Sequence, residues 1–233
     1  MRLIDKQIIE VPIEKVPGID SFFGRMMKLD TNEVPKKFKD NYYRSKEDSY
    51  KNFTIEAIYN SYKVIELTCD RIRLEDGTVI ENELLSQVFF GSSEVLFCVI
   101  SLKGYEYLEE AYDDMIYKLF LDSWGTAFVE MAYIWLKSEI AKELSKDGLH
   151  ITHSFSPGQN DIPMEMQKVI FGHLDPGKIG VTLNDSYMMH PKKSISGIIG
   201  VGGSCNISKI RPCDICEKRA TCNWAHSDQG NEQ

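Results

Sequence analysis

The sequence lacks the features that would direct it to a membrane, to secretion or to a nucleic acid. No apolar run approaches the roughly 18 residues that a membrane helix needs. The N-terminal stretch MRLIDKQIIEVPIEKV alternates apolar and charged residues, whereas a signal peptide has an unbroken apolar core. Basic residues are outnumbered, 27 against 35 acidic ones, and the net charge of −8 disfavours contact with phosphate backbones. We therefore expect a cytoplasmic protein that binds neither membrane nor nucleic acid.

Internal repeats and low-complexity segments are also missing. The composition is that of an ordinary folded protein, with 42% hydrophobic and 27% charged residues. A length of 233 residues allows one large domain or two small ones with a real core. The order of helical and strand patterns along the chain predicts an α+β protein.

Hydrophobic periodicity predicts two strand regions after a helix. Residues 47–65 carry apolar and aromatic residues at helical spacing and predict that helix. Residues 64–80 predict two strands joined by a turn at Asp76-Gly77. The dense β-branched stretch 93–104 predicts a buried strand. The charged segment 29–44 is predicted to be a solvated connector, with a flap or a docking arm as the alternative.

The longest helical pattern runs from residue 105 to residue 146. Gly125 interrupts it, which predicts either two helices or one helix that bends there. Gly148 supplies a suitable end. Residues 178–203 then predict strands separated by turns.

A rigid turn precedes the next helix, in the stretch THSFSPGQNDIPMEMQ (152–167). Pro157 fixes φ, and Gly158 permits a positive φ. Such a turn holds backbone N–H and C=O groups in place, which suits a ligand site, although plain connectors share the pattern. Asp161 is predicted to be the helix N-cap and Pro163 to lie in the first turn.

The six cysteines fall into two groups. Cys69 and Cys98 lie in apolar stretches and are expected to be inert core thiols. The other four lie within 18 residues near the C-terminus with the spacing C-x7-C-x2-C-x5-C: Cys205, Cys213, Cys216 and Cys222. In a reducing compartment such a cluster indicates metal binding more than disulfides. The single short C-x2-C turn favours an iron–sulfur cluster, with zinc and no metal as the alternatives.

Three segments in this order resemble the activation (reactivation) domain of cobalamin-dependent methionine synthase. They are DSWGTAFVEMAYIWL (122–136), SFSPGQNDIPMEMQKVIFGHLD (154–175) and LNDSYMMHPKKSISGIIG (183–200). The resemblance extends over about residues 55–224, and the cysteine tail is similar to that of free-standing relatives. It implies a mixed sheet with long helices and a C-terminal metal-binding tail. The implied division is an N-terminal extension (1–45), an activation-domain-like α+β domain (46–203) and the cysteine-rich tail (204–233).

The resemblance also implies a function. Family members bind S-adenosylmethionine near the Pro-Gly loop and present it to a corrinoid carried by a partner, which is a corrinoid protein or a corrinoid-dependent methyltransferase. Inactive Co(II) is reduced uphill to Co(I), and methyl transfer traps the product. We therefore expect reductive activation of a corrinoid system, with an iron–sulfur cluster in the tail as electron relay. The alternative is a non-catalytic redox or adaptor protein of the same fold that docks a corrinoid protein and has lost S-adenosylmethionine binding.

The resemblance carries a set of candidate cofactor-binding residues, but no catalytic residue. They are Glu130, His153, Ser154, Ser156, Pro157, Gly158 and Gln159. Glu130 matches an acidic position of the family helix; an exposed glutamate on a polar helix face is the competing interpretation. Ser154 stands where the family loop has arginine, and Gln159 where it has tyrosine, so a carboxylate-binding guanidinium and an aromatic ring are both missing. A protonated His153 would replace the arginine only in part.

The third segment has a packing interpretation beside a pocket-lining one. Small residues there allow a strand to pack closely against the Pro-Gly loop. Lys192 and Lys193 are expected to be surface charges. The residues concerned are Met189, Pro191, Ser194, Ser196 and Gly197.

Overall fold

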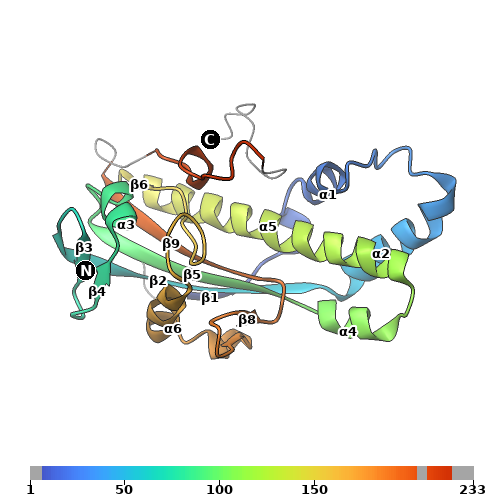
Figure 1. Cartoon of the computed structure of the whole chain (residues 1–233). Helices are drawn as coiled ribbons and strands as arrows, with labels where there is room; N and C mark the ends of the chain where they lie inside the picture. Colours follow the sequence, from blue (N-terminus) through green and yellow to red (C-terminus); the bar gives the residue numbers. More distant parts are fainter. Residues whose placement is uncertain (1–6, 204–208, 222–233) are drawn as a thin grey trace.

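An antiparallel sheet of seven strands forms the centre of the computed structural model, which describes residues 7–203 and 209–221 (Figure 1). The strand order is β4-β3-β2-β5-β9-β6, and β1 pairs with β2. The bounds are β1 Gln7–Glu10, β2 Thr54–Leu67, β3 Arg71–Leu74, β4 Val79–Glu81, β5 Glu94–Lys103, β6 Leu149–Ile151 and β9 Ser194–Gly203. A separate two-stranded sheet consists of β7 Thr182–Leu183 and β8 Met189–His190.

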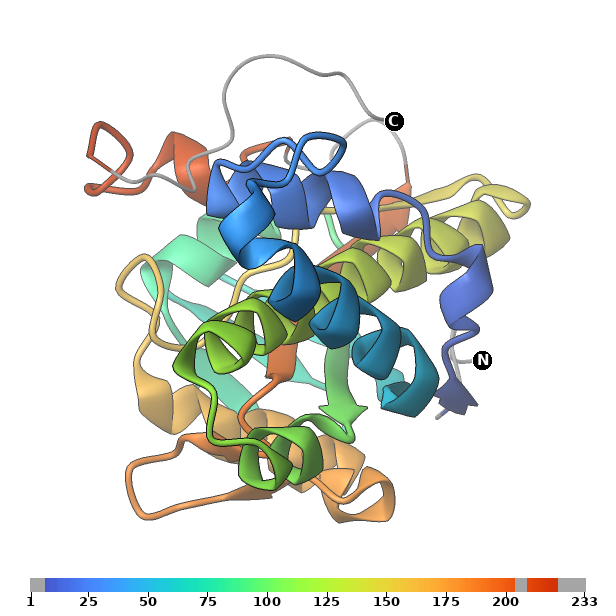
Figure 2. The same ribbon diagram turned by 90° about the vertical axis from the view of Figure 1, so that its right-hand side faces the viewer.

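Helices cover both faces of this sheet. Their bounds are α1 Ile19–Met27, α2 Lys39–Asn52, α3 Glu83–Val88, α4 Tyr105–Ala111, α5 Met115–Ser145 and α6 Gln167–Leu174. The long helix α5 lies along one face, and α6 lies on the other (Figure 1). Figure 2 shows α1 and α2 on the α5 side of the molecule. There the ring of Phe23 in α1 stacks on Trp124 of α5 with centroids 3.8 Å apart.

Strand β5 shows why this arrangement gives two cores. Its side chains alternate between the faces of the sheet because a strand has a period of two. Leu96, Cys98 and Ile100 are buried in the core beneath α5, whereas Val95 and Phe97 are buried in the core beneath α6. The predicted buried strand is confirmed, as is the predicted hairpin turn at Asp76-Gly77 between β3 and β4.

Gly125 lies inside α5 and does not divide it. The predicted pattern does contain two helices, but the break between them falls at residues 112–114, between α4 and α5. A Cβ added at Gly125 would lie 3.1 Å from Cε of Lys193 and 3.1 Å from Cδ2 of Tyr105. The Lys193 side chain crosses the helix at this point and is 12% exposed. Its Nζ lies 2.7 Å from Oδ1 of Asp122 and 2.9 Å from Oγ1 of Thr126. The missing side chain of Gly125 therefore leaves room for the methylene groups of Lys193 to pack against α5. Because this lysine is largely buried, the expectation that Lys193 is a surface charge is wrong.

The predicted helix over residues 47–65 is correct only as far as Asn52. Helix α2 ends at Asn52, and β2 begins at Thr54. The apolar residues after Phe53 fit both a helical and a strand period over this short span. Pairing along the whole length of β5, from Thr54 opposite Lys103 onward, decides in favour of the strand.

Two further expectations near the N-terminal half need correction. The segment 29–44 is not a solvated connector throughout, because α2 begins at Lys39 and Tyr42 is 2% exposed in the core. Cys69 is exposed between β2 and β3, whereas Cys98 is buried as predicted.

The proposed division of the chain at residues 45 and 203 stays a prediction; α2 runs across the first boundary. None of the helices in the described ranges has the length and apolar character to cross a membrane.

Candidate functional site

The loop after β6 continues along β9 and is fastened to it. Phe155 and Ile198 exchange two backbone hydrogen bonds, with N–O distances of 3.0 and 2.8 Å. The hydroxyl of Ser156 donates to the carbonyl oxygen of Ser196 at 2.8 Å. Pro157 is buried. The first half of the candidate loop is therefore held by the central sheet.

The Pro-Gly turn has the rigidity that the sequence predicts. Gly158 has φ +82°, and its N–H donates to the carbonyl of Ile162 at 2.7 Å. A Cβ at Gly158 would lie 2.5 Å from Sδ of Met164, so a side chain is excluded by both conformation and space. Asp161 is not an N-cap, because it has φ +60°, and the following 3-10 helix Met164–Met166 has Pro163 at its N-cap position.

A pair of hydroxyl groups connects the loop to α5. Tyr133 Oη and Ser154 Oγ lie 2.5 Å apart. They fit against β9 because Gly197 has no side chain: a Cβ there would approach both oxygens closer than the 3.0 Å that real Cβ atoms keep. Cys98 lies opposite Gly197 on β5 and is fully buried, which raises the pKa of its thiol to about 12. This supports the predicted close packing of the third segment against the loop.

Glu130 and Lys137 lie on the same side of α5 as Tyr133. Residues i, i+3 and i+7 share one helix face. Glu130 is half-buried, and burial raises the pKa of its carboxyl, an effect that the charge of Lys137 partly offsets. Burial also lowers the pKa of the half-buried Lys137, against the opposing effect of Glu130. Half-burial argues against the interpretation of Glu130 as a solvated surface charge.

The remaining candidate residues lie on the outer side of the loop. His153 is exposed, and its carbonyl accepts a hydrogen bond from the hydroxyl of Thr152 at 2.8 Å. Gly158 and Gln159 are exposed at the turn. The structure thus brings Ser154 to α5 and Ser156 to β9 and leaves three of the seven candidates toward solvent.

Sequence reasoning missed Tyr133 and Lys137. The signal that would have found them is their spacing from Glu130, three and seven residues along one helix. This spacing indicates a shared site only once α5 is known to pack against the loop, because Tyr133 taken alone is an ordinary core aromatic residue.

The described part of the cysteine tail contacts the candidate loop. Nδ2 of Asn160 donates to the carbonyl of Pro212 at 2.7 Å. Pro212 opens a short 3-10 helix, Pro212–Asp214, which carries Cys213; Cys216 follows. Both cysteines are half-buried and free of disulfides. No group of three or more potential metal-binding side chains occurs within residues 7–203 and 209–221; two of the four predicted metal ligands, Cys205 and Cys222, lie outside these ranges.

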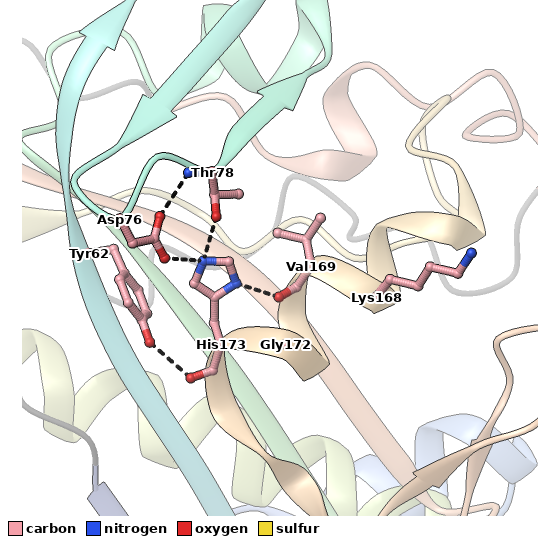
Figure 3. Close-up of a pocket in the computed structure, with 7 residues that line it drawn as sticks. All are labelled: Tyr62, Asp76, Thr78, Lys168, Val169, Gly172 and His173. Carbon is pink, nitrogen blue, oxygen red and sulfur yellow. Dashed lines mark hydrogen bonds and ion pairs between the residues drawn. The ribbon is translucent and has the colours of Figure 1, made fainter.

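A cavity of about 420 Å³ lies on the opposite, α6 side of the sheet (Figure 3). His173 of α6 lies at its wall and faces the tip of the β3–β4 hairpin. Its Nε2 lies 2.8 Å from Oδ2 of Asp76 and 3.2 Å from Oγ1 of Thr78, and its Nδ1 donates to the carbonyl of Val169 at 2.6 Å. The Tyr62 hydroxyl donates to the carbonyl of His173 at 2.9 Å. The lining residues are Tyr62, Asp76, Thr78, Lys168, Val169, Gly172 and His173.

Apart from Lys168, the polar side chains of this cavity bind to His173. Lys168 points away from His173 (Figure 3), and its ammonium lies 4.6 Å from the ring centroid of Tyr187. We interpret the contacts of His173 with Asp76 and Thr78 as structural, because they hold the β3–β4 hairpin against α6. A smaller cavity of about 130 Å³ lies at the outer strands and is lined by Glu66, Arg71, Arg73 and Val79. Neither cavity contains a candidate residue from the Pro-Gly loop.

Comparison with known proteins supports the fold. No protein-family model matches the sequence, and no curated protein shows a significant sequence match. Among solved structures, the crystal structure of the MetH reactivation domain bound to AdoHcy is similar to this chain, with a TM-score of 0.57 and 12% identity. The match covers 84% of this chain and 78% of that one. The predicted α+β fold with long helices is thereby confirmed, as is the resemblance at the level of fold. The prediction of a mixed sheet is wrong, because every described strand pair of the central sheet is antiparallel. The free-standing type and the metal-binding tail stay predictions.

Proposed function

We propose that this protein takes part in the reactivation of a corrinoid-dependent methyltransferase system. The observation that carries the proposal is the fold match over most of both chains to a reactivation domain bound to AdoHcy. The partner would be a corrinoid protein or a corrinoid-dependent methyltransferase. S-adenosylmethionine would bind between α5 and the loop 152–163, where Ser154, Tyr133 and Gly197 already join helix, loop and sheet.

The chemistry has two steps, each with a defined electron source. A one-electron donor reduces the partner's Co(II) corrinoid to Co(I). Co(I) then donates an electron pair to the methyl carbon of S-adenosylmethionine while the S–CH₃ bond breaks, and its electron pair stays on sulfur. The products are methyl-Co(III) and neutral S-adenosylhomocysteine. Because the second step consumes Co(I), it draws the uphill reduction forward.

Glu130 is suited to hold the sulfonium group. Burial disfavours its ionised form, and a positive charge nearby favours that form again. A bound sulfonium would therefore supply the counter-charge that the half-buried carboxylate lacks. S-adenosylhomocysteine has no such charge, so the same contact would favour substrate over product.

The cysteine tail would hold a thiolate-bound metal centre, a part of the proposal that rests on the spacing of its four cysteines. Cys213 and Cys216 are free thiols three residues apart, the first in the 3-10 helix Pro212–Asp214 and the second two residues after its end. Together with Cys205 and Cys222 they would hold an iron–sulfur cluster, with zinc as the alternative. Such a cluster would supply single electrons when bound. The hydrogen bond from Asn160 to Pro212 supports a tail that lies against the methyl-donor loop.

A second candidate function has its own support. The hydroxyls of Ser154 and Ser156 both have partners inside the protein, Tyr133 and the Ser196 carbonyl. Exposed Gln159 brings no aromatic ring to the loop. These contacts favour an adaptor or redox protein that docks the corrinoid partner without binding S-adenosylmethionine.

A methyl-transfer assay separates the two candidates. The full chain, purified without oxygen, is mixed with a Co(II) corrinoid protein from the same organism, a one-electron reductant and S-adenosylmethionine labelled in its methyl group. The proposal predicts labelled methyl-Co(III) only when all four components are present. Accelerated Co(II) reduction without label on cobalt would instead establish the adaptor or redox function, and no effect on cobalt would refute both.

A further inference from the structure

Lys137 differs from the other lysines near the end of α5. Lys142 and Lys146 are exposed, and each pairs with a glutamate three residues earlier on the helix. Lys137 is half-buried and forms no ion pair within the described part of the chain; its ammonium lies 4.6 Å from the ring centroid of Tyr133. Among the described residues, this cation thus has an aromatic ring and no ion-pair partner beside it.

The surroundings of Lys137 offer it little negative charge. Cys98 is fully buried and its pKa is raised to about 12, so the thiol is neutral at pH 7. Burial likewise raises the pKa of the Tyr133 hydroxyl, which is neutral too. On this helix face the carboxyl of Glu130 lies seven residues away, or about 10 Å along the axis, and its charge only partly offsets the effect of burial on the pKa of Lys137. A partly desolvated ammonium without a counter-ion is costly, and a ligand anion would offset that cost.

We propose that Lys137 binds the carboxylate of the ligand's amino-acid end, beside the Tyr133 and Ser154 hydroxyls. This inference rests on the proposed S-adenosylmethionine site. The helix face then carries an acid at one end, Glu130, and a base at the other, Lys137. A ligand with a sulfonium cation and a carboxylate matches this polarity. Lys137 would thereby decide specificity for S-adenosyl amino acids over adenosyl compounds that lack the carboxyl group.

The test compares two ligands that differ only in that group. Calorimetric titration of the full chain with S-adenosylmethionine and with decarboxylated S-adenosylmethionine measures what the carboxylate contributes. Wild-type protein should bind S-adenosylmethionine roughly tenfold or more tightly, as expected for a hydrogen bond between charged groups. Lys137→Met should bind both ligands equally, and Lys137→Arg should retain the preference.

Controls keep the outcomes distinct. Lys142→Met, which removes an exposed lysine from the same helix, should behave as wild type. Thermal unfolding should show Lys137→Met to be at least as stable as wild type, since the variant loses a poorly solvated charge and keeps most of the stem. A Lys137→Met protein that still prefers the carboxylated ligand overturns the inference and leaves the proposed function standing. A wild-type protein that binds neither ligand overturns both.

Discussion

Gly197→Ala should disturb the candidate site more than its one added methyl group suggests. The new Cβ would come closer than 3.0 Å to both Tyr133 Oη and Ser154 Oγ, and within 3.2 Å of Tyr133 Cζ. None of these atoms is at the end of a flexible exposed chain, so loop or helix must shift. Overpacking of this kind costs about 1–3 kcal/mol. For a chain of this size the melting temperature should fall by about 2–4 °C per kcal/mol, or about 2–12 °C in all.

The assay is differential scanning calorimetry with a rescue background. Tyr133→Phe combined with Ser154→Ala removes both hydroxyls that the new Cβ would strike, and loss of a whole hydrogen-bonded pair is far less costly than loss of one partner. Gly197→Ala should therefore lower the melting temperature less in that double variant than in wild type. Equal losses in the two backgrounds, or no loss in wild type, would refute this account of how loop, helix and sheet fit together.

Three further predictions concern charged groups. Burial raises the pKa of Glu130 above its unfolded value, so ionisation of this carboxyl costs stability as pH rises through the folded pKa. Glu130→Gln should therefore have a higher free energy of unfolding than wild type at about pH 8. Urea titrations should show that this difference vanishes near pH 4. Although burial acts in the opposite direction, hydrogen bonds from Thr78 and the charge of His173 lower the pKa of Asp76. The free energy of unfolding by which wild type exceeds Asp76→Asn should be full above about pH 5 and should shrink as pH falls below about 4. A difference that stays constant with pH would contradict the interpretation that these contacts hold the hairpin to α6. Lys193→Met should lower the melting temperature by about 2–4 °C, because the partly exposed ion pair between Lys193 and Asp122 of α5 contributes about 1 kcal/mol. As the control, Lys192→Met removes an exposed lysine and should change the melting temperature far less.

Sequence patterns predict strands best where the spacing of apolar residues fits the period of a strand and does not also fit that of a helix. Strand β5 and the Asp76-Gly77 hairpin belong to this class. The α2–β2 boundary was missed because apolar residues from Phe53 to Tyr62 satisfy two periods, and only pairing with β5 chooses between them. Gly125 was misread for a related reason. A helix glycine predicts a bend when nothing approaches it, yet here a lysine from a distant segment lies against it.

The candidate site was predictable in its backbone and not in its side chains. Pro157 and Gly158 specify the turn locally, so their conformation follows from residue type. The contact between Tyr133 and Ser154 depends on the missing side chain of Gly197, on a strand more than 40 residues after the loop begins. No local pattern encodes such a meeting, because tertiary packing alone sets it. The same holds for Lys137, whose half-burial against the Tyr133 ring, without an ion pair to any described residue, follows from tertiary packing.

We propose that α5 and the loop 152–163 hold S-adenosylmethionine with Glu130 at the sulfonium. The most direct measurement is a calorimetric titration of the full chain, purified without oxygen, with S-adenosylmethionine and with S-adenosylhomocysteine, in wild type and in Glu130→Gln. We expect saturable binding, a preference of wild type for the sulfonium ligand, and loss of that preference in the variant. Absence of binding by intact protein, or an unchanged preference in Glu130→Gln, would contradict it.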